Sequence, residues 1–207
     1  MLRGLYAITP DETDTRVLLN KVQLALAGGA RLLQYRNKRA DRGLKREQAA
    51  ALARLCRVHD TTFIINDDLS LALEVGAHGV HLGGEDGDLA EARRQLGPDR
   101  LLGASCYNRL DLAVAAREAG ASYVAFGAAF ASPTKPGAVH APLELYRRAH
   151  AEIGLPVVAI GGITPGNAQA LIRAGADAVA VITALYAAPD IGTAAQQFCK
   201  LFDSRTP

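Results

Sequence analysis

The sequence contains no tryptophan, and only 5% of its 207 residues are aromatic. Proteins that bind single-stranded nucleic acid by stacking need exposed aromatic side chains, so this class is not expected. An excess of basic charge is missing too, because 23 Lys and Arg residues stand against 21 Asp and Glu residues, a formal net charge of +2. Proteins that bind nucleic acid or membrane surfaces usually carry a basic face. We therefore expect neither partner, and any bound anion must be held by a local group of bases.

Long apolar runs and paired cysteines are also absent. No apolar run reaches the roughly 18 residues that a membrane-spanning helix needs, and the first ten residues do not resemble a signal peptide. The three cysteines, Cys56, Cys106 and Cys199, are an odd number without metal-ligand spacing. This pattern predicts free thiols and a cytoplasmic location.

Eight short apolar runs recur along the chain, each followed by a polar turn and a stretch rich in Ala and Leu. They are almost continuously apolar, as buried parallel strands are. The runs cover residues 5–9, 31–36, 62–66, 79–83, 101–105, 123–127, 156–161 and 178–183. Eight such units predict a compact single-domain (β/α)8 TIM barrel over residues 1–207. The alternative is a doubly wound open sheet, but nothing in the order of the runs marks a strand reversal.

Between the runs, spaced Leu, Ala and Val with Arg and Glu on the other side predict helices. They are expected over residues 17–27, 46–58, 110–119 and 168–174. Gly-containing segments at 27–30, 75–79, 119–122 and 174–177 predict the helix ends, where Gly adopts the left-handed conformation. The shortest unit lies between residues 63 and 80, so its helix is expected to have two or three turns.

In α/β barrels the chemistry lies at the carboxyl ends of the strands. The unusual polar residues of this sequence come directly after the apolar runs, and they are therefore the candidate site. They are Gln34, Arg36, Lys38, Asn66, Asp67, Asp68, Asp86, Ser105, Ser132, Thr134, Lys135, the turn at 161–167 and Thr183. Their concentration on one rim is the strongest functional signal in the sequence.

Gln34, Arg36 and Lys38 alternate and point to the same side of an extended chain. An amide, a guanidinium and an ammonium group on one side form a grip for an anion. The alternative is a strand end with solvated bases. Lys135, expected on the same rim, favours the anion grip.

Asp67 and Asp86 follow neighbouring runs. Two carboxylates that face bases suit Mg²⁺, which takes one or two carboxylates together with substrate oxygens. A general acid–base pair is an alternative, although no histidine partner is visible. Either Asp67 or Asp68 could instead cap the following helix. We expect one of these two aspartates to cap and the other to bind metal.

The segment 160–167, IGGITPGN, places two glycines at a strand end and a proline at a helix start. Free backbone N–H groups at such a helix start bind phosphate, and barrel phosphate sites lie after strands seven and eight. A plain tight turn is the alternative. The hydroxyls of Ser132, Thr134 and Thr183 could add donors. The dinucleotide pattern GxGxxG is absent.

Histidines and cysteines offer weaker signals. His78 and His81 are three residues apart and are expected on opposite faces of a strand, where both are structural. Cys106 has no visible base beside it and is expected to pack at the rim. No Ser-His-Asp set is evident.

The two predicted anion-binding groups indicate two phosphorylated ligands. The expected chemistry is electrostatic stabilisation of a phosphate-type leaving group.

In chain order, the segments LYAIT, QYRNK, FIINDD, GVHLGGED, GASCYN, YVAFGAAFASPTKPGA, AIGGIT and GADAVAVITAL are similar to the thiamine-phosphate synthase family. The resemblance covers essentially the whole chain. It implies a transferase that joins 4-amino-2-methyl-5-(diphosphooxymethyl)pyrimidine to 4-methyl-5-(2-phosphooxyethyl)thiazole. Thiamine phosphate and pyrophosphate are the implied products, and pyrophosphate leaves first with the help of Mg²⁺.

The resemblance also implies roles for individual residues. Arg36, Lys38 and Lys135 would be catalytic, and Asp67 and Asp86 would bind Mg²⁺. The pyrimidine diphosphate would be held by Gln34, Tyr35, Arg36, Asn37, Lys38, Asn66, Ser105 and Lys135. The thiazole phosphate would be held by Ser132, Pro133, Thr134, Gly162, Ile182 and Thr183.

Three positions depart from the family pattern: Gly84, where Gln is common, Ala131, and Ala180, where Ser is common. They put the path of one loop and one phosphate donor in doubt. Two other functions stay open at this point, a thiazole tautomerase and a non-catalytic barrel that binds thiamine phosphates. The sequence leaves a homo-oligomer open as well.

Overall fold

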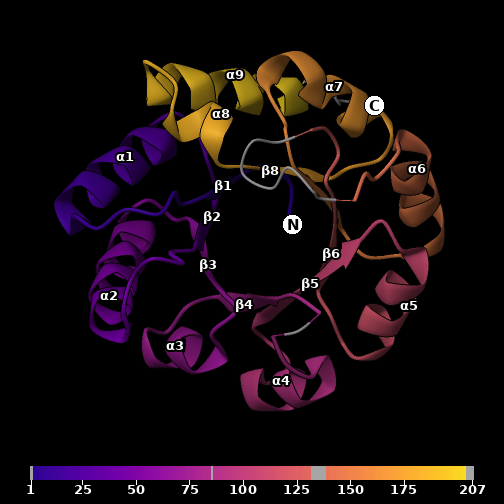
Figure 1. Ribbon diagram of the computed structural model, residues 1–207, viewed down its shortest axis with the longest axis horizontal. Coiled ribbons are helices and arrows are strands. Elements are labelled where there is room, and N and C mark those ends of the chain that lie inside the picture. The colour runs from indigo at the N-terminus through magenta and orange to yellow at the C-terminus, as the bar shows by residue number, and fades with distance from the viewer. Residues whose placement is uncertain (1, 85, 132–138, 204–207) are drawn as a thin grey trace.

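Eight parallel strands form a closed ring in the computed structural model, which describes residues 2–84, 86–131 and 139–203 (Figure 1). The strands are β1 (Gly4–Ile8), β2 (Leu32–Tyr35), β3 (Thr62–Asn66), β4 (Gly79–Leu82), β5 (Leu101–Tyr107), β6 (Tyr123–Phe126), β7 (Val157–Ile160) and β8 (Ala178–Val181). Each strand pairs with the next, and β1 also pairs with β8, with Leu5 beside Val179. This last pairing closes the sheet. The predicted barrel is confirmed, and the open doubly wound sheet is wrong.

Helices surround the ring on its outer side (Figure 1). They are α1 (Thr15–Ala27), α2 (Arg42–Val58), α3 (Leu69–Glu74), α4 (Leu89–Leu96), α5 (Leu110–Glu118), α6 (Leu143–Glu152), α7 (Pro165–Arg173), α8 (Thr183–Tyr186) and α9 (Ile191–Asp203). The four predicted helices are all present. α2 begins four residues earlier than expected because Asp41 caps it, accepting a hydrogen bond from the Leu44 N–H. In the part of the chain that the structure describes, no helix is both long and apolar enough to cross a membrane.

The helices end at the predicted glycine-containing segments. Gly29, Gly76, Gly120 and Gly175 have φ angles of 105°, 63°, 87° and 107°, which side chains with a Cβ adopt only with strain. Each turn sends the chain into the next strand after a few residues. α3 has only six residues and is shorter than expected, so the β3–β4 unit is the tightest of the barrel.

Alternate residues of the strands face two different cores. Leu5 and Leu33 belong to the large apolar layer between strands and helices. Tyr6 and Tyr123 point into the barrel, where they pack with Ile64 and other interior side chains. Because side chains alternate along a strand, continuously apolar runs are needed to fill both layers. The interior layer also carries the polar groups that form the floor of the site.

The interior is tight at Gly103 of β5. A Cβ atom added there would lie 2.1 Å from Tyr123 Cζ and 2.5 Å from His81 Nδ1. We expect Gly103→Ala to lower the free energy of unfolding by about 1–3 kcal/mol, because an overpacked core forces side chains out of place. Urea denaturation measures this loss.

Gly166 in α7 offers the matched control. A Cβ there would meet only Thr164 Oγ1, at 3.8 Å. Since Ala favours a helix over Gly, Gly166→Ala should leave the stability unchanged or raise it slightly. An equal loss in both variants would contradict the tight packing of the barrel interior.

Candidate active site

The candidate residues that the structure describes lie at the carboxyl ends of the strands, on one rim of the barrel. Gln34 belongs to β2, Asn66 ends β3 and Ser105 lies in the last part of β5. Gly162 follows β7, and Thr183 follows β8. The residues Ser132, Pro133, Thr134 and Lys135 lie outside the described part of the chain, so their roles stay predictions.

Arg36 and Lys38 are held in place by the loop after β1. Thr9 Oγ1 accepts a hydrogen bond from Arg36 N at 2.9 Å and donates one to Arg36 O at 2.8 Å. Asp11 Oδ1 lies 3.2 Å from Arg36 Nη1 and accepts a hydrogen bond from Lys38 N at 2.9 Å. Asp11 was not predicted, although it follows the first apolar run in the same way that the other site residues follow theirs.

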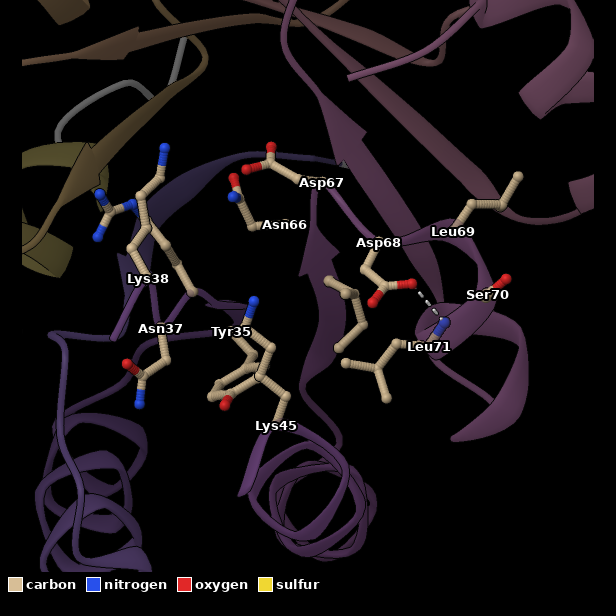
Figure 2. Close-up of a pocket in the computed structure, with 12 residues that line it drawn as sticks. Tyr35, Asn37, Lys38, Lys45, Asn66, Asp67, Asp68, Leu69, Ser70 and Leu71 are labelled. Carbon is tan, nitrogen blue, oxygen red and sulfur yellow. Dashed lines mark hydrogen bonds between the residues drawn. The ribbon is translucent and has the colours of Figure 1, made fainter. Parts of the chain in front are cut away.

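Tyr35 and Asn37 point away from this side. Tyr35 Oη donates to Gln48 Oε1 at 2.9 Å, and Asn37 Nδ2 donates to the same oxygen at 3.0 Å and to Glu12 O at 2.6 Å. Gln48 lies on α2 and is fully buried. Figure 2 shows the side chains of Asn37 and Lys38 pointing in opposite directions. The predicted alternation is therefore present, and the side chains of Tyr35 and Asn37 brace the loop from behind. Both residues also line the pocket at this rim, and their contact with substrate stays a prediction.

Of the two neighbouring aspartates, Asp68 is the one that caps the following helix, while the metal-binding role of Asp67 stays a prediction. Asp68 caps α3 by accepting a hydrogen bond from Leu71 N at 2.9 Å (Figure 2). Asp67 has a φ of 64°, a left-handed conformation that aspartate tolerates better than most residues. This backbone turns its carboxylate away from the helix and toward the rim.

The carboxylate of Asp67 lies close to that of Asp86. Burial, and then the neighbouring Asp86, raise the pKa of Asp67 from 3.8 to about 6, while Lys38 and a hydrogen bond from Asn66 lower it. Asp86 is placed by its own turn, in which its Oδ2 accepts a hydrogen bond from Gly83 N at 2.9 Å. A cation between the two carboxylates would relieve their mutual repulsion, so this pair is a candidate cation site.

The donor set fits Mg²⁺. Mg²⁺ is bound by one or two carboxylates and keeps several water or substrate oxygens. Across residues 2–84, 86–131 and 139–203, no group of three or more His, Cys, Asp or Glu side chains gathers. The site therefore offers two hard oxygen ligands rather than the closed set of a structural zinc site.

A pocket of about 400 Å³ lies at the rim beside β2 and β3 (Figure 2). Arg36, Lys38, Asn66 and Asp67 line it, so it brings the cationic and acidic halves of the predicted site together. Lys45 of α2 adds a third base to its wall. A cavity with bases on one side and a carboxylate on the other suits a ligand that carries phosphate groups and a bound cation.

The floor of the barrel mouth is polar. Ser105 Oγ lies 2.9 Å from His81 Nε2, and the imidazole stacks on the ring of Tyr123. Burial lowers the pKa of His81 to about 4, so the ring is neutral near pH 7. His78 faces the other way and accepts a hydrogen bond from Phe63 N. The two histidines are on opposite faces as predicted, but His81 contacts a site residue, which the sequence analysis did not foresee.

The loops after β6 and β7 approach each other closely at Gly162. This residue has a φ of 61°, and a Cβ there would lie 2.3 Å from Ala131 O. Its carbonyl accepts a hydrogen bond from Asn167 Nδ2 at 3.0 Å. After β8, Ile182 occupies the N-cap position of the short helix α8, which begins at Thr183, without a side-chain hydrogen bond. The helix starts of α7 and α8 thus lie on the same rim, where barrel phosphate sites are found.

The departures at Gly84 and Ala180 leave the rim intact. Gly84 N donates to Tyr107 Oη at 3.3 Å, so the β4 turn is tied to the end of β5 without a side chain at position 84. Ala180 is buried inside the barrel and packs in the interior layer. Cys106, also buried, has a pKa raised to about 12 by burial, which agrees with a packing role.

A family model described as thiamine monophosphate synthase matches residues 5–185. The chain belongs to this family. A thiamine-phosphate synthase from Methylobacillus flagellatus is 57% identical over 202 residues, which cover 98% of this chain and 96% of the relative. A second one, from Thioalkalivibrio sulfidiphilus, is 54% identical over 203 residues, with the same coverage.

The solved structures agree with this assignment. The thiamine phosphate pyrophosphorylase from Pyrococcus furiosus superposes with a TM-score of 0.85 at 35% identity, and the match covers 97% of this chain and 96% of that chain. The family resemblance of the sequence motifs is therefore confirmed. As predicted, the chain is an enzyme, and the similar thiamine-phosphate synthases are transferases.

Proposed function

We propose that the chain forms thiamine phosphate and pyrophosphate from 4-amino-2-methyl-5-(diphosphooxymethyl)pyrimidine and 4-methyl-5-(2-phosphooxyethyl)thiazole. Two kinds of observation support this proposal. The relatives are named thiamine-phosphate synthase over nearly the whole chain. The observation that carries it is that Arg36 and Lys38 line the same pocket as Asp67, because a diphosphate with a bound cation needs both charges.

In this proposal, Arg36 and Lys38 bind the diphosphate and stabilise the negative charge that grows on it. The bond between the pyrimidine methylene carbon and the diphosphate oxygen breaks, and its electron pair leaves with the oxygen. The lone pair of the thiazole nitrogen then forms the new carbon–nitrogen bond. Neither step needs an acid or a base, because the growing charge is stabilised electrostatically.

Asp67 and Asp86 would hold Mg²⁺, with Asn66 donating a hydrogen bond to the Asp67 carboxylate. The ion would supply further positive charge to the departing pyrophosphate. Lys135 is proposed to join Arg36 and Lys38 in this task.

The thiazole phosphate is proposed to bind on the opposite part of the rim. Gly162 lies after β7, and Ile182 and Thr183 lie at the start of α8. Backbone N–H groups at such positions favour phosphate. The two substrates would then reach the mouth from two sides, with Ser132, Pro133 and Thr134 completing the thiazole half.

A thiazole tautomerase and a non-catalytic binding barrel are the other readings of the same fold. Both need the thiazole phosphate half, and neither has a use for a carboxylate pair that faces two cations. The presence of Arg36, Lys38, Asp67 and Asp86 in one region favours the synthase.

The direct test is incubation of the purified protein with both substrates and Mg²⁺. We expect thiamine phosphate and pyrophosphate to appear in equal amounts, measured by chromatography and by a coupled pyrophosphate assay. Omission of either substrate, or addition of EDTA, should abolish both products. Isomerisation of a thiazole carboxylate without any thiamine phosphate would instead support the tautomerase.

A further inference from the structure

A continuous chain of hydrogen bonds crosses the inside of the barrel below the site. Gln34 Nε2 donates to Tyr6 Oη at 3.0 Å, and Tyr6 Oη lies 2.9 Å from Tyr123 Oη. Tyr123 Oη lies 3.1 Å from His81 Nδ1, and His81 Nε2 lies 2.9 Å from Ser105 Oγ. Five strands contribute one residue each, so the closed barrel, and not a local sequence motif, assembles this chain.

The direction of the chain follows from its first bond. The amide nitrogen of Gln34 can only donate, so Tyr6 Oη accepts there and must give its own proton to another group. The partner within reach is Tyr123 Oη. Tyr123 then donates to His81 Nδ1. A neutral imidazole that accepts at Nδ1 carries its proton on Nε2, so His81 donates to Ser105 Oγ.

The reverse direction is less favourable. If Tyr123 donated to Tyr6, then Tyr6 Oη would accept two hydrogen bonds, and its own proton would have no acceptor among the described residues. Tyr6 is only 1% exposed, so water does not reach it freely. An unpaired buried hydroxyl costs free energy, and native structures avoid it. The edge-on contact of Tyr6 with Tyr123 and the stacking of Tyr123 on His81 keep the rings in these positions.

We propose that Tyr6, Tyr123 and His81 are positioning residues that set the hydrogen-bond polarity of the barrel floor. They leave the Ser105 O–H free to donate toward the mouth, because the bond with His81 uses Ser105 Oγ as an acceptor. They also fix the Gln34 amide by using one of its two N–H groups, so that Gln34 Oε1 stays free to accept. The floor therefore matches a ring that presents an acceptor nitrogen to Ser105 and an N–H donor to Gln34.

An aminopyrimidine has both groups, whereas the corresponding hydroxypyrimidine exchanges the donor for an acceptor. The identity of this ligand rests on the proposed function, but the direction of the hydrogen-bond chain does not. Ser105 and Gln34 would contact the ring, while Tyr6, Tyr123 and His81 would act only through them.

The first test measures the tautomer of His81 in the ligand-free enzyme. A two-bond ¹H–¹⁵N correlation spectrum of ¹⁵N-histidine-labelled protein near neutral pH distinguishes Nε2–H from Nδ1–H, and His81→Gln identifies the His81 signals among the five histidines. We expect the neutral Nε2–H form. The Nδ1–H form would overturn the proposal, whether or not the enzyme makes thiamine phosphate. The Nε2–H form in a protein without synthase activity would support the hydrogen-bond chain and refute the proposed function.

The second test breaks the chain at Tyr123. Tyr123→Phe removes the donor to His81 Nδ1, so the Nδ1–H tautomer should become populated. The KM for the pyrimidine diphosphate should rise about 3- to 10-fold, as loss of one hydrogen bond allows, while the KM for the thiazole phosphate should change less than about 2-fold on the same grounds. If this variant does not fold, Tyr6→Phe tests the same chain one bond further away.

Tyr146→Phe is the matched control. Tyr146 of α6 is also buried and donates to Phe126 O at 3.0 Å, but it lies outside the barrel interior. Its loss should leave both the His81 tautomer and the KM for the pyrimidine unchanged. Equal effects of Tyr146→Phe and Tyr123→Phe would show general loosening of the fold and would overturn the positioning role.

Discussion

The Asp67→Asn variant is expected to be more stable than the wild type without Mg²⁺ and yet to lose at least about 100-fold in turnover, the equivalent of losing a few kcal/mol of charge stabilisation. Asn cannot replace a metal-binding carboxylate, so the activity falls. The stability rises because Asn removes the cost of burying a charged carboxylate and then its repulsion by Asp86, and Asn also tolerates the φ of 64° at this position. The Asp67 carboxylate is therefore expected to serve the reaction while it lowers the free energy of unfolding.

The sign of the effect follows from the pKa of Asp67, which is raised from 3.8 to about 6 in the folded protein. At pH values below the pKa of Asp67 in the unfolded chain, Asp67 is protonated in both the folded and the unfolded protein and does not lower the free energy of unfolding. As the pH rises toward 6, the unfolded chain releases its proton first, so the stability of the wild type falls. Above about 6 the penalty is complete. Because the group is about half exposed, we expect roughly 1 kcal/mol, or 2–4 °C in Tm, after allowance for solvent screening.

Thermal unfolding with EDTA at pH 5 and pH 8, together with steady-state kinetics, measures both effects. Excess Mg²⁺ should raise the Tm of the wild type and not that of Asp67→Asn, since only a protein that binds the ion is stabilised by it. Asp68→Asn is the control: Asn also caps helices, so α3 and the turnover should be preserved. Unchanged turnover in Asp67→Asn would remove Asp67 from the metal site.

Arg36→Gln is expected to lower kcat/KM for the pyrimidine diphosphate by about 100- to 1000-fold, the range seen when one group that stabilises developing charge is removed. Arg36 is held by Thr9 and Asp11, so its guanidinium is placed before the substrate arrives. Because Arg36 is preorganised, its substitution should lower kcat/KM more than substitution of a basic side chain that moves freely. The KM for the thiazole phosphate should stay nearly unchanged, because its proposed site lies after β7 and β8.

Arg39→Gln is the control for this variant, since it makes the same change of charge in the same loop. Arg39 is exposed, and its backbone N–H donates to Asn37 Oδ1, a contact that the substitution keeps. Its activity should stay within about 2-fold of the wild type, as for surface substitutions in general. Steady-state kinetics with each substrate varied in turn measures both variants. Equal losses would mean that the general field of the loop, and not the placed guanidinium of Arg36, helps the reaction.

The strands were predictable because their chemistry is local. A run such as residues 123–127 is apolar at every position, and only a strand buried on both faces uses such a run. The glycines at 29, 76, 120 and 175 mark the helix ends for an equally local reason, the φ angle that they adopt. α3 was less predictable, because its length depends on how closely β3 and β4 approach each other.

The rim residues were found by a single rule: the polar residue after a strand faces the site. The rule predicted the rim on which Arg36, Lys38 and Asp67 lie together. It did not show that the side chains of Tyr35 and Asn37 bond to Gln48 on α2. Nothing in the pattern of α2 distinguishes a buried glutamine from an exposed one, so this brace became visible only when helix and strand were packed.

Local sequence determined the periodicity of this chain, the ends of its helices and the side of the barrel on which its charged residues stand, because each depends on near neighbours. Tertiary structure alone decided which of those residues meet. The pairing of β1 with β8 brings the interior residues of five strands into one hydrogen-bond chain, and the approach of Asp67 to Asp86 shifts a pKa. Contacts between residues as distant as Tyr6 and Tyr123 depend on closure of the ring, which no short segment encodes.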